Sequence, residues 1–186
     1  MDIITLRDAF IRGAVSVEKH GNAIRPWRLP HEKQRLFASG ADDQLLGRAT
    51  MQAGVRLELE TDTDNLSLVC APDETDRPFD LCCHNDIRQA GVLAAGQTEM
   101  TFRDLPQGTN TLSIWLPQQH TVWLRELHVD KGATVKPREQ TQRKWITYGS
   151  SITHCGAAHS PARTWPAVVA READLDLTCL GFGGQC

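Results

Sequence analysis

A serine and a glycine-rich segment near the end of the chain are the residues best suited to do chemistry. Ser151 lies in the turn Gly149-Ser150-Ser151, which follows the short apolar segment Trp145–Tyr148. A serine on a tight turn between a strand and a helix is exposed and can act as a nucleophile. The segment Gly181-Phe182-Gly183-Gly184 follows a second apolar run, Leu175–Leu180. Such a turn can direct backbone N–H groups at a developing oxyanion, so the two segments together predict attack on a carbonyl.

The elements around these turns predict a strand–helix–strand unit. Strands are expected over Trp145–Tyr148 and Leu175–Leu180, and the residues between them have helical spacing, namely Trp165, Val168, Val169 and Ala173. Thr164 suits the N-cap of that helix, and Pro166 suits its first turn. The strands of such a unit run parallel with a right-handed connection. Both turns therefore lie at the carboxyl edge of one sheet, where ligands of open α/β sheets bind.

These motifs resemble those of the SGNH/GDSL hydrolases. The residues that carry the resemblance are Tyr148-Gly-Ser-Ser-Ile-Thr153, Ser160-Pro-Ala-Arg-Thr-Trp-Pro166 and Leu180-Gly-Phe-Gly-Gly-Gln185. In particular, the chain is similar to bacterial esterases with an N-terminal β-sandwich ahead of the hydrolase domain. The resemblance implies that Ser151 is the nucleophile, that the N–H groups of Ser151 and Gly184 form the oxyanion hole, and that no cofactor is needed. Ser150 replaces the aspartate of the family's Gly-Asp-Ser, whose side chain is not part of the triad.

The same family carries its acid and base in a later Asp-x-x-His block, and no such block follows Ser151 here. His154 and His159 are the only later histidines. We expect His154 to be a surface or helix-start residue, because a residue on the nucleophile's own turn cannot easily approach Oγ from the open side. The alternative for Ser151 is a capping serine in a nucleotide-binding turn, but the phosphate-loop patterns Gly-x-Gly-x-x-Gly and Gly-Lys-Ser/Thr do not occur.

Residues 1–135 predict an antiparallel β-sandwich or jelly roll. Short segments with alternating apolar residues recur every 8–15 residues: 55–59, 66–70, 79–83, 100–105, 112–116 and 122–129. In the first, Arg56, Glu58 and Glu60 alternate with apolar residues, which is typical of a strand with one solvent-facing side. The alternation changes phase at Arg125-Glu126, which predicts a β-bulge. Residues 136–144 are polar and predict a linker to a flavodoxin-like α/β hydrolase domain that begins at 145 and is incomplete at 186.

Two further groups of residues could bind a ligand. Trp115 and Trp123 become direct cross-strand neighbours if residues 117–121 form the loop between their strands. Paired indoles could stack on a sugar ring, but burial against the opposite sheet or the hydrolase domain is the commoner arrangement. Cys82 and His84 could share a metal ion, but a structural zinc site needs four ligands, and no second pair is positioned for it. We therefore expect no metal, and free, mostly buried cysteines.

Composition excludes several classes of protein. The chain has 186 residues, 20 Lys and Arg against 23 Asp and Glu, and a net charge of −3, so no basic surface for nucleic acid is expected. Its apolar runs are too short for a membrane span, and its acidic start does not resemble a signal peptide, which favours a cytoplasmic protein.

The sequence leaves two functions open. The first is a serine esterase that acts on a small ester or an acylated carbohydrate, with these residues alone inactive or incomplete. The alternative is a non-catalytic β-sandwich that binds carbohydrate or a protein partner and carries a residual hydrolase fragment. A parallel two-stranded unit cannot cover both faces of its sheet, so we expect it to pack on the sandwich or to be covered in a homo-oligomer.

Overall fold

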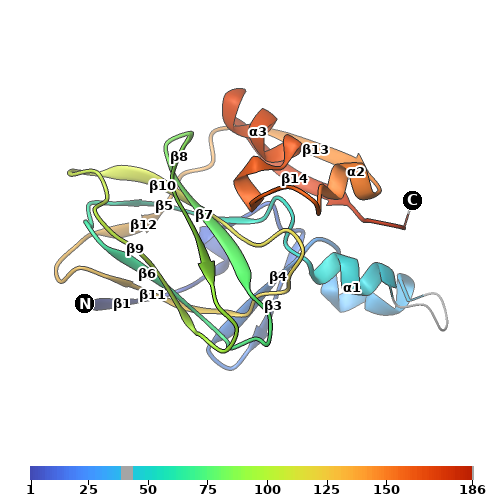
Figure 1. Ribbon diagram of the computed structural model, residues 1–186, viewed down its shortest axis with the longest axis horizontal. Coiled ribbons are helices and arrows are strands. Elements are labelled where there is room, and N and C mark those ends of the chain that lie inside the picture. The colour runs from blue at the N-terminus through green and yellow to red at the C-terminus, as the bar shows by residue number, and fades with distance from the viewer. Residues whose placement is uncertain (39–43, 186) are drawn as a thin grey trace.

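The computed structural model describes residues 1–38 and 44–185, and its larger part is a β-sandwich of two antiparallel sheets (Figure 1). The first sheet has the order β3-β4-β11-β6-β9, with β1 paired to β11. Its strands are β1 (Asp2–Thr5), β3 (Ser16–His20), β4 (Ala23–Trp27), β6 (Leu66–Cys70), β9 (Glu99–Phe102) and β11 (Leu124–Val129). The predicted bulge is confirmed, since the register between β11 and β6 shifts between Leu124 and Glu126.

The second sheet has the order β12-β5-β10-β7-β8, with β2 paired to β5. Its strands are β2 (Ile11–Arg12), β5 (Arg56–Thr61), β7 (Arg77–Cys83), β8 (Asp86–Leu93), β10 (Asn110–Trp115) and β12 (Val135–Pro137). Alternating residues such as Leu57, Leu68 and Ile114 point between the sheets and are fully buried, so the core follows the period of two in the sequence. The predicted β-sandwich is confirmed. Strand β12 extends this sheet into the predicted linker.

Helices outside the strands are short. They are the 3₁₀ helices η1 (Asp8–Phe10) and η2 (His31–Leu36) and the α-helix α1 (Gln44–Thr50), which precedes β5. None of the described helices is long and apolar enough to cross a membrane.

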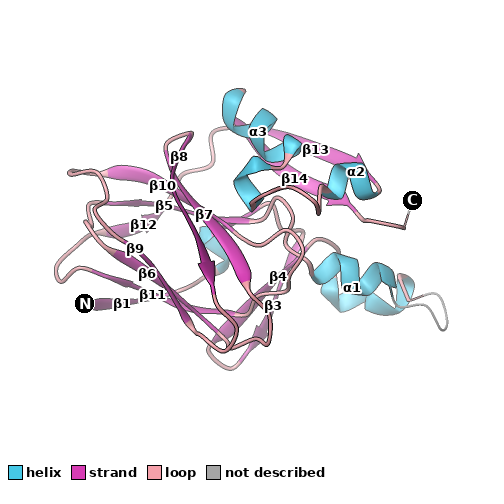
Figure 2. Ribbon diagram, in the orientation of Figure 1, coloured by secondary structure: helices cyan, strands magenta, loops and turns pink. Residues whose placement is uncertain are grey.

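Residues after 142 form a small parallel unit (Figure 2). Strand β13 (Arg143–Gly149) pairs in parallel with β14 (Leu175–Gly181), as predicted, and Gly149 lies opposite Gly181. The segment between them contains α2 (Ser151–His154), η3 (Pro161–Arg163) and α3 (Trp165–Glu172). Thr164 caps α3 by accepting a hydrogen bond from the Ala167 N–H. The predicted start of this helix at Thr164 and Pro166 is therefore confirmed. We call residues 143–185 the tail unit.

The tail unit packs on the outer face of the second sheet. Trp115 and Cys82 of the sandwich form one buried cluster with Ala167, Leu177 and Cys179 of the tail unit. The same contact corrects the prediction of a solvent-facing side on β5. Arg56 and Glu58 are only 2% and 3% exposed, because Arg56 bonds Glu58 and Asp176 of β14. Charged residues that form a buried ion pair can alternate with apolar residues just as solvent-exposed ones do. The alternation alone therefore could not distinguish a buried side of the strand from an exposed one.

Candidate active site

Ser151 occupies the turn that joins β13 to α2. It is the first residue of α2 and is exposed, so its hydroxyl and its N–H are accessible. The N–H of a first helical residue has no carbonyl partner within its own helix. Gly181, at the end of β14, allows the two turns to approach each other, since a Cβ there would overlap the backbone of Thr153 and His154. The two glycine-containing turns are thus adjacent, as the sequence predicted from parallel strands.

The loop after β14 directs its backbone groups in a defined way. Phe182 donates its N–H to the Gly149 carbonyl over 2.8 Å, and Gln185 donates to the Phe182 carbonyl over 3.0 Å. The Gly183 N–H is bound by Nδ1 of His154 at 3.2 Å. Among the described residues, the Gly184 N–H has no hydrogen-bond partner. Gly184 has a φ of +79°, a conformation that other residues rarely adopt. The loop therefore leaves one N–H available, the one predicted as an oxyanion donor.

His154 is buried between the turn and the sandwich, with only 3% of its surface exposed. Its Nε2–H donates to the Gln118 carbonyl over 2.7 Å, and its Nδ1 accepts from Gly183, which fixes one neutral tautomer. Burial, together with the positive charges of Arg28 and Arg48, lowers its pKa from 6.5 to about 4. The prediction of a surface or helix-start histidine is wrong, because His154 is the last residue of α2 and its side chain is buried against the Gln118 carbonyl of the sandwich.

Arg28, next to β4, fastens the tail unit to the sandwich. Its guanidinium is fully buried and donates to four carbonyl oxygens, those of Arg48, Met51, Cys179 and Gly181. Arg48 and Met51 lie at the end of helix α1, and Cys179 and Gly181 lie at the end of β14. Burial lowers the Arg28 pKa to about 10, which still leaves the group charged at neutral pH. A single cation therefore connects a helix of the sandwich domain to the edge of the candidate site.

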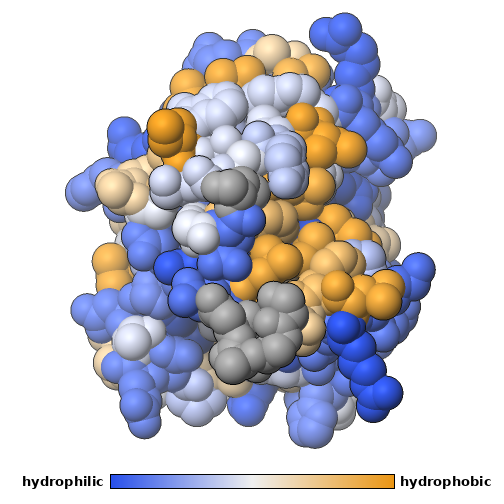
Figure 3. All heavy atoms as spheres, turned by 90° about the vertical axis from the view of Figure 1, so that its right-hand side faces the viewer, coloured by the Kyte–Doolittle hydropathy of each residue, from blue (hydrophilic) through white to orange (hydrophobic). Residues whose placement is uncertain are grey.

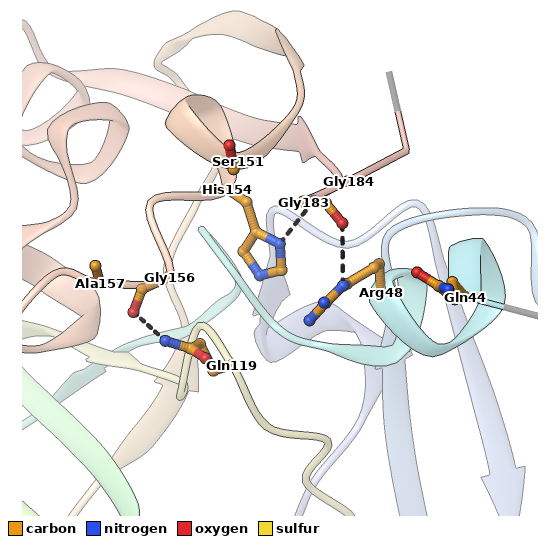
Figure 4. A pocket seen from close by; sticks show the side chains of 9 residues that line it. All are labelled: Gln44, Arg48, Gln119, Ser151, His154, Gly156, Ala157, Gly183 and Gly184. Carbon is orange, nitrogen blue, oxygen red and sulfur yellow. Dashed lines mark hydrogen bonds between the residues drawn. The ribbon is translucent and has the colours of Figure 1, made fainter.

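A pocket of about 440 Å³ lies between these elements (Figure 4). Its lining combines tail residues with sandwich residues: Gln44, Arg48, Gln119, Ser151, His154, Gly156, Ala157, Gly183 and Gly184. Figure 4 shows Arg48 approaching from α1 and Gln119 from the loop after β10, where its amide donates to the Gly156 carbonyl. The sequence analysis did not identify Arg48, Arg28 or Gln119. Nothing in their local pattern relates them to Ser151, which lies 32 positions after Gln119 and 123 after Arg28.

A second, more apolar groove of about 680 Å³ also includes Ser151 in its lining. It is lined mainly by residues of α2 and α3, including Ile152, Trp165, Val168 and Val169, all of which are partly or largely exposed. Figure 3 views the molecule from the side of α1 and the C-terminal residues, and shows apolar side chains beside hydrophilic ones on that surface. Ser151 thus lines both a pocket with polar groups and a groove with few.

The two predicted ligand-contact tryptophans do not form a pair. Strands β10 and β11 belong to different sheets, so the expectation that Trp115 and Trp123 are cross-strand neighbours is wrong. Trp115 is 2% exposed and lies under the tail unit, with the Arg56 guanidinium 5.1 Å from its ring centre. Trp123 is half-buried, and the Arg25 guanidinium covers its ring at 4.5 Å. Residues 117–121 cross between the sheets instead of closing a hairpin.

The cysteines of the described chain are free. Cys82 is buried under the tail unit, whereas His84 is exposed in the turn between β7 and β8. Within residues 1–38 and 44–185, no group of three or more His, Cys, Asp or Glu side chains could hold a metal ion. Cys186 lies outside the described residues.

Comparison with known proteins identifies the family. The model of the SsfX3 N-terminal domain matches residues 10–125, which is most of the sandwich and more than half of the chain. The chain belongs to the SsfX3 N-terminal domain family. No curated protein sequence matches it.

Solved structures extend this family likeness through the tail unit. Salicylyl-acyltransferase SsfX3 from a tetracycline biosynthetic pathway is 31% identical, with a TM-score of 0.89 over 100% of this chain and 56% of that one. A GDSL-like lipase from Bacteroides ovatus is 18% identical, with a TM-score of 0.70 over 94% of this chain and 54% of that one. An acetyl xylan esterase from Butyrivibrio proteoclasticus is 12% identical, with a TM-score of 0.62 over 99% and 50%.

The chain therefore spans about half the length of these solved relatives. The likeness to the lipase and the xylan esterase shows a shared fold.

Proposed function

We propose that this chain supplies the nucleophile and the oxyanion hole of an SGNH-type serine acyl hydrolase or acyltransferase. The observation that carries the proposal is that exposed Ser151 and the Gly184 N–H, which has no partner among the described residues, line one pocket. The parallel pair β13–β14 would then be the start of a flavodoxin-like α/β domain. Sequence motif and geometry support the same two residues independently.

In the proposed reaction, the Ser151 hydroxyl oxygen attacks the acyl carbonyl of an ester. The carbonyl π electrons move to its oxygen, and the N–H groups of Ser151 and Gly184 stabilise that oxyanion. Collapse of the tetrahedral intermediate expels the alcohol and leaves an acyl-serine. Attack by water on that ester completes hydrolysis, whereas attack by a second alcohol completes acyl transfer.

We propose that the proton of Ser151 goes to a base outside the described residues. His154 is unsuitable, because Nδ1 accepts from Gly183, Nε2–H donates to Gln118, and its lowered pKa makes it a weak base. We infer that a histidine beyond this chain performs that role in the complete gene product, as the resemblance to SGNH hydrolases implies.

The substrate class we propose is a small acyl group on a carbohydrate or another polar alcohol. Support comes from the acetyl xylan esterase and the carbohydrate esterases of family two among structures with this fold, and from the acyltransferase SsfX3. The polar side chains of Gln44 and Gln119 line the pocket, which suits such an alcohol.

Labelling of the complete gene product with a fluorophosphonate tests this function. We expect one adduct on Ser151 and hydrolysis of p-nitrophenyl acetate, both abolished in Ser151→Ala. Ser150→Ala is the matched control, since Ser150 makes no side-chain cap bond to α2, and it should keep both properties. A protein that neither labels nor hydrolyses would support the binding module instead.

A further inference from the structure

The peptide that joins Gly183 to Gly184 is held from the sandwich domain. Arg48 donates from Nε to the Gly183 carbonyl oxygen over 3.1 Å (Figure 4). A trans peptide is planar, and its C=O and N–H point in opposite directions. The described residues contain no cis peptide bond. The Gly184 N–H therefore points away from the Arg48 guanidinium.

The preceding peptide is held as well. Its N–H, that of Gly183, is bound by Nδ1 of His154, and its carbonyl, that of Phe182, accepts from Gln185. Ser151 lies close to this peptide, since a Cβ on Gly183 would be 3.8 Å from the Ser151 Cα. Two successive peptides are thus fixed beside the nucleophile, and the one hydrogen-bonding group of the pair left open is the Gly184 N–H.

The Arg48 side chain has few other partners that would compete with its bond to this peptide. Its Nη1 contacts the Met51 sulfur at 3.5 Å, a weak acceptor, and in the part of the chain that the structure describes no carboxylate forms an ion pair with it. Within residues 1–38 and 44–185, it is also the only charged side chain in the pocket lining, because His154 is neutral. Its charge therefore polarises the Gly183 carbonyl, which makes the N–H of the same peptide a stronger donor.

We propose that Arg48 is a positioning residue of the oxyanion hole, which holds the Gly183 carbonyl so that the Gly184 N–H points at the oxyanion formed next to Ser151. This inference rests on the function proposed above. Through Arg48, the sandwich domain takes part in the chemistry of the site as well as in its support. Preorganised donors of this kind stabilise a transition state without having to reorient during the reaction.

Docking of the tail unit does not depend on this bond. Arg28 already attaches β14 to the sandwich through the carbonyls of Cys179 and Gly181, and the Arg48 backbone carbonyl, which Arg28 also binds, remains in any side-chain variant. A change in the Arg48 side chain is therefore expected to alter catalysis with little loss of stability. Loss of Arg28, in contrast, is expected to lower stability, because its guanidinium holds the end of β14 and the Arg48 carbonyl.

Steady-state kinetics of Arg48→Met and Arg48→Lys in the complete gene product test the proposal. We expect Arg48→Met to lower kcat by about 10- to 100-fold, less than the 10²–10³ for removal of an oxyanion donor itself, with KM within about twofold. Arg48→Lys should recover part of the loss, because an ammonium can still donate to the carbonyl. Arg35→Met is the matched control, since Arg35 is exposed on η2 and lines no part of this pocket.

The carbonyl ¹³C shift of Gly183 in the NMR spectrum is the second readout. We expect this chemical shift to change in Arg48→Met and to stay the same in Arg35→Met, because only Arg48→Met loses the hydrogen bond to the Gly183 carbonyl. A moved carbonyl shift with an unchanged kcat would overturn the positioning role, and an unchanged shift would show that Arg48 does not hold this peptide. A wild-type protein without any acyl-transfer activity would contradict the proposed function instead, while the shift would still report the bond.

Discussion

The two sides of the tail unit differ sharply in how they are covered. On the side that meets the sandwich, Leu177 and Cys179 are buried, and Arg28 and Arg56 bind the strand's carbonyl and carboxylate groups. On the opposite side, Ile152 is 80% exposed and Ile146 is 63% exposed. The buried side combines apolar packing with satisfied polar groups, as in the interior of a domain. The exposed side has apolar residues without such partners.

The difference shows which contact is built into the chain. An interface in which buried cations meet specific carbonyl oxygens fixes one orientation, because any shift leaves those groups unsatisfied. The apolar residues on the other side do not specify an orientation by themselves. Changes on the two sides should therefore have different consequences.

The largest effect is expected from Arg28→Met. The variant leaves four buried carbonyl oxygens without their donor, so the free energy of unfolding should fall by on the order of 4 kcal/mol. Urea unfolding measures the loss, and limited proteolysis should show faster cleavage between β12 and β13. Arg25→Met is the matched control, because Arg25 is only partly buried and should cost about 1 kcal/mol. Equal losses in both variants would contradict the role of Arg28.

The second prediction concerns acid pH and His154. Its pKa in the folded protein is about 4, below the ordinary 6.5, because burial disfavours the charged imidazole. The unfolded chain therefore binds more protons between these values, and stability should fall as pH decreases from about 6.5 to about 4. The full loss is on the order of 3 kcal/mol, since the two pKa values differ by about 2.5 and one pKa unit corresponds to about 1.4 kcal/mol.

Unfolding curves at a series of pH values measure this dependence. The difference between wild type and His154→Gln should show it, whereas His159→Gln, which changes an exposed histidine, should keep the wild-type slope. A His154→Gln variant with the wild-type slope would show that other groups cause the acid sensitivity.

The smallest effect on stability is expected on the exposed side. Ile152→Ser should change the free energy of unfolding by less than about 0.5 kcal/mol, because the side chain is already in solvent. If this side is covered in a homo-oligomer, sedimentation velocity should show weaker self-association of the variant. Leu177→Ala, on the buried side, should instead cost about 3 kcal/mol and leave association unchanged. Similar losses of stability in Ile152→Ser and Leu177→Ala would contradict the difference between the exposed and the buried side of the tail unit.

Much of the fold follows from the sequence, because its signals are local. Alternating apolar residues predicted the strands of the sandwich, and Thr164 with Pro166 predicted the start of α3. The two glycine-containing turns predicted which segments are neighbours in the site. The failures concern contacts between distant segments. The burial of Arg56 and His154 depends on the tail unit meeting the sandwich, and the separation of Trp115 from Trp123 depends on a crossover between sheets.

The candidate site shows the same division. Ser151 and Gly184 belong to local motifs and could be named from the sequence, whereas Arg48 and Gln118 reach the site from a helix and a loop far along the chain. A long-range polar contact leaves no periodic trace in the residues that make it. Only the folded arrangement reveals it.

The contact between His154 and the Gln118 carbonyl also bears on the order of folding. Gln118 lies in the loop that crosses between the two sheets, so its carbonyl takes this position when the sandwich forms. The sandwich precedes the tail unit along the chain. Domains generally fold as units during synthesis, beginning at the N-terminus. The sandwich is thus available as a template when residues 143–185 emerge from the ribosome, and the loop after β14 takes its shape against a surface that already exists.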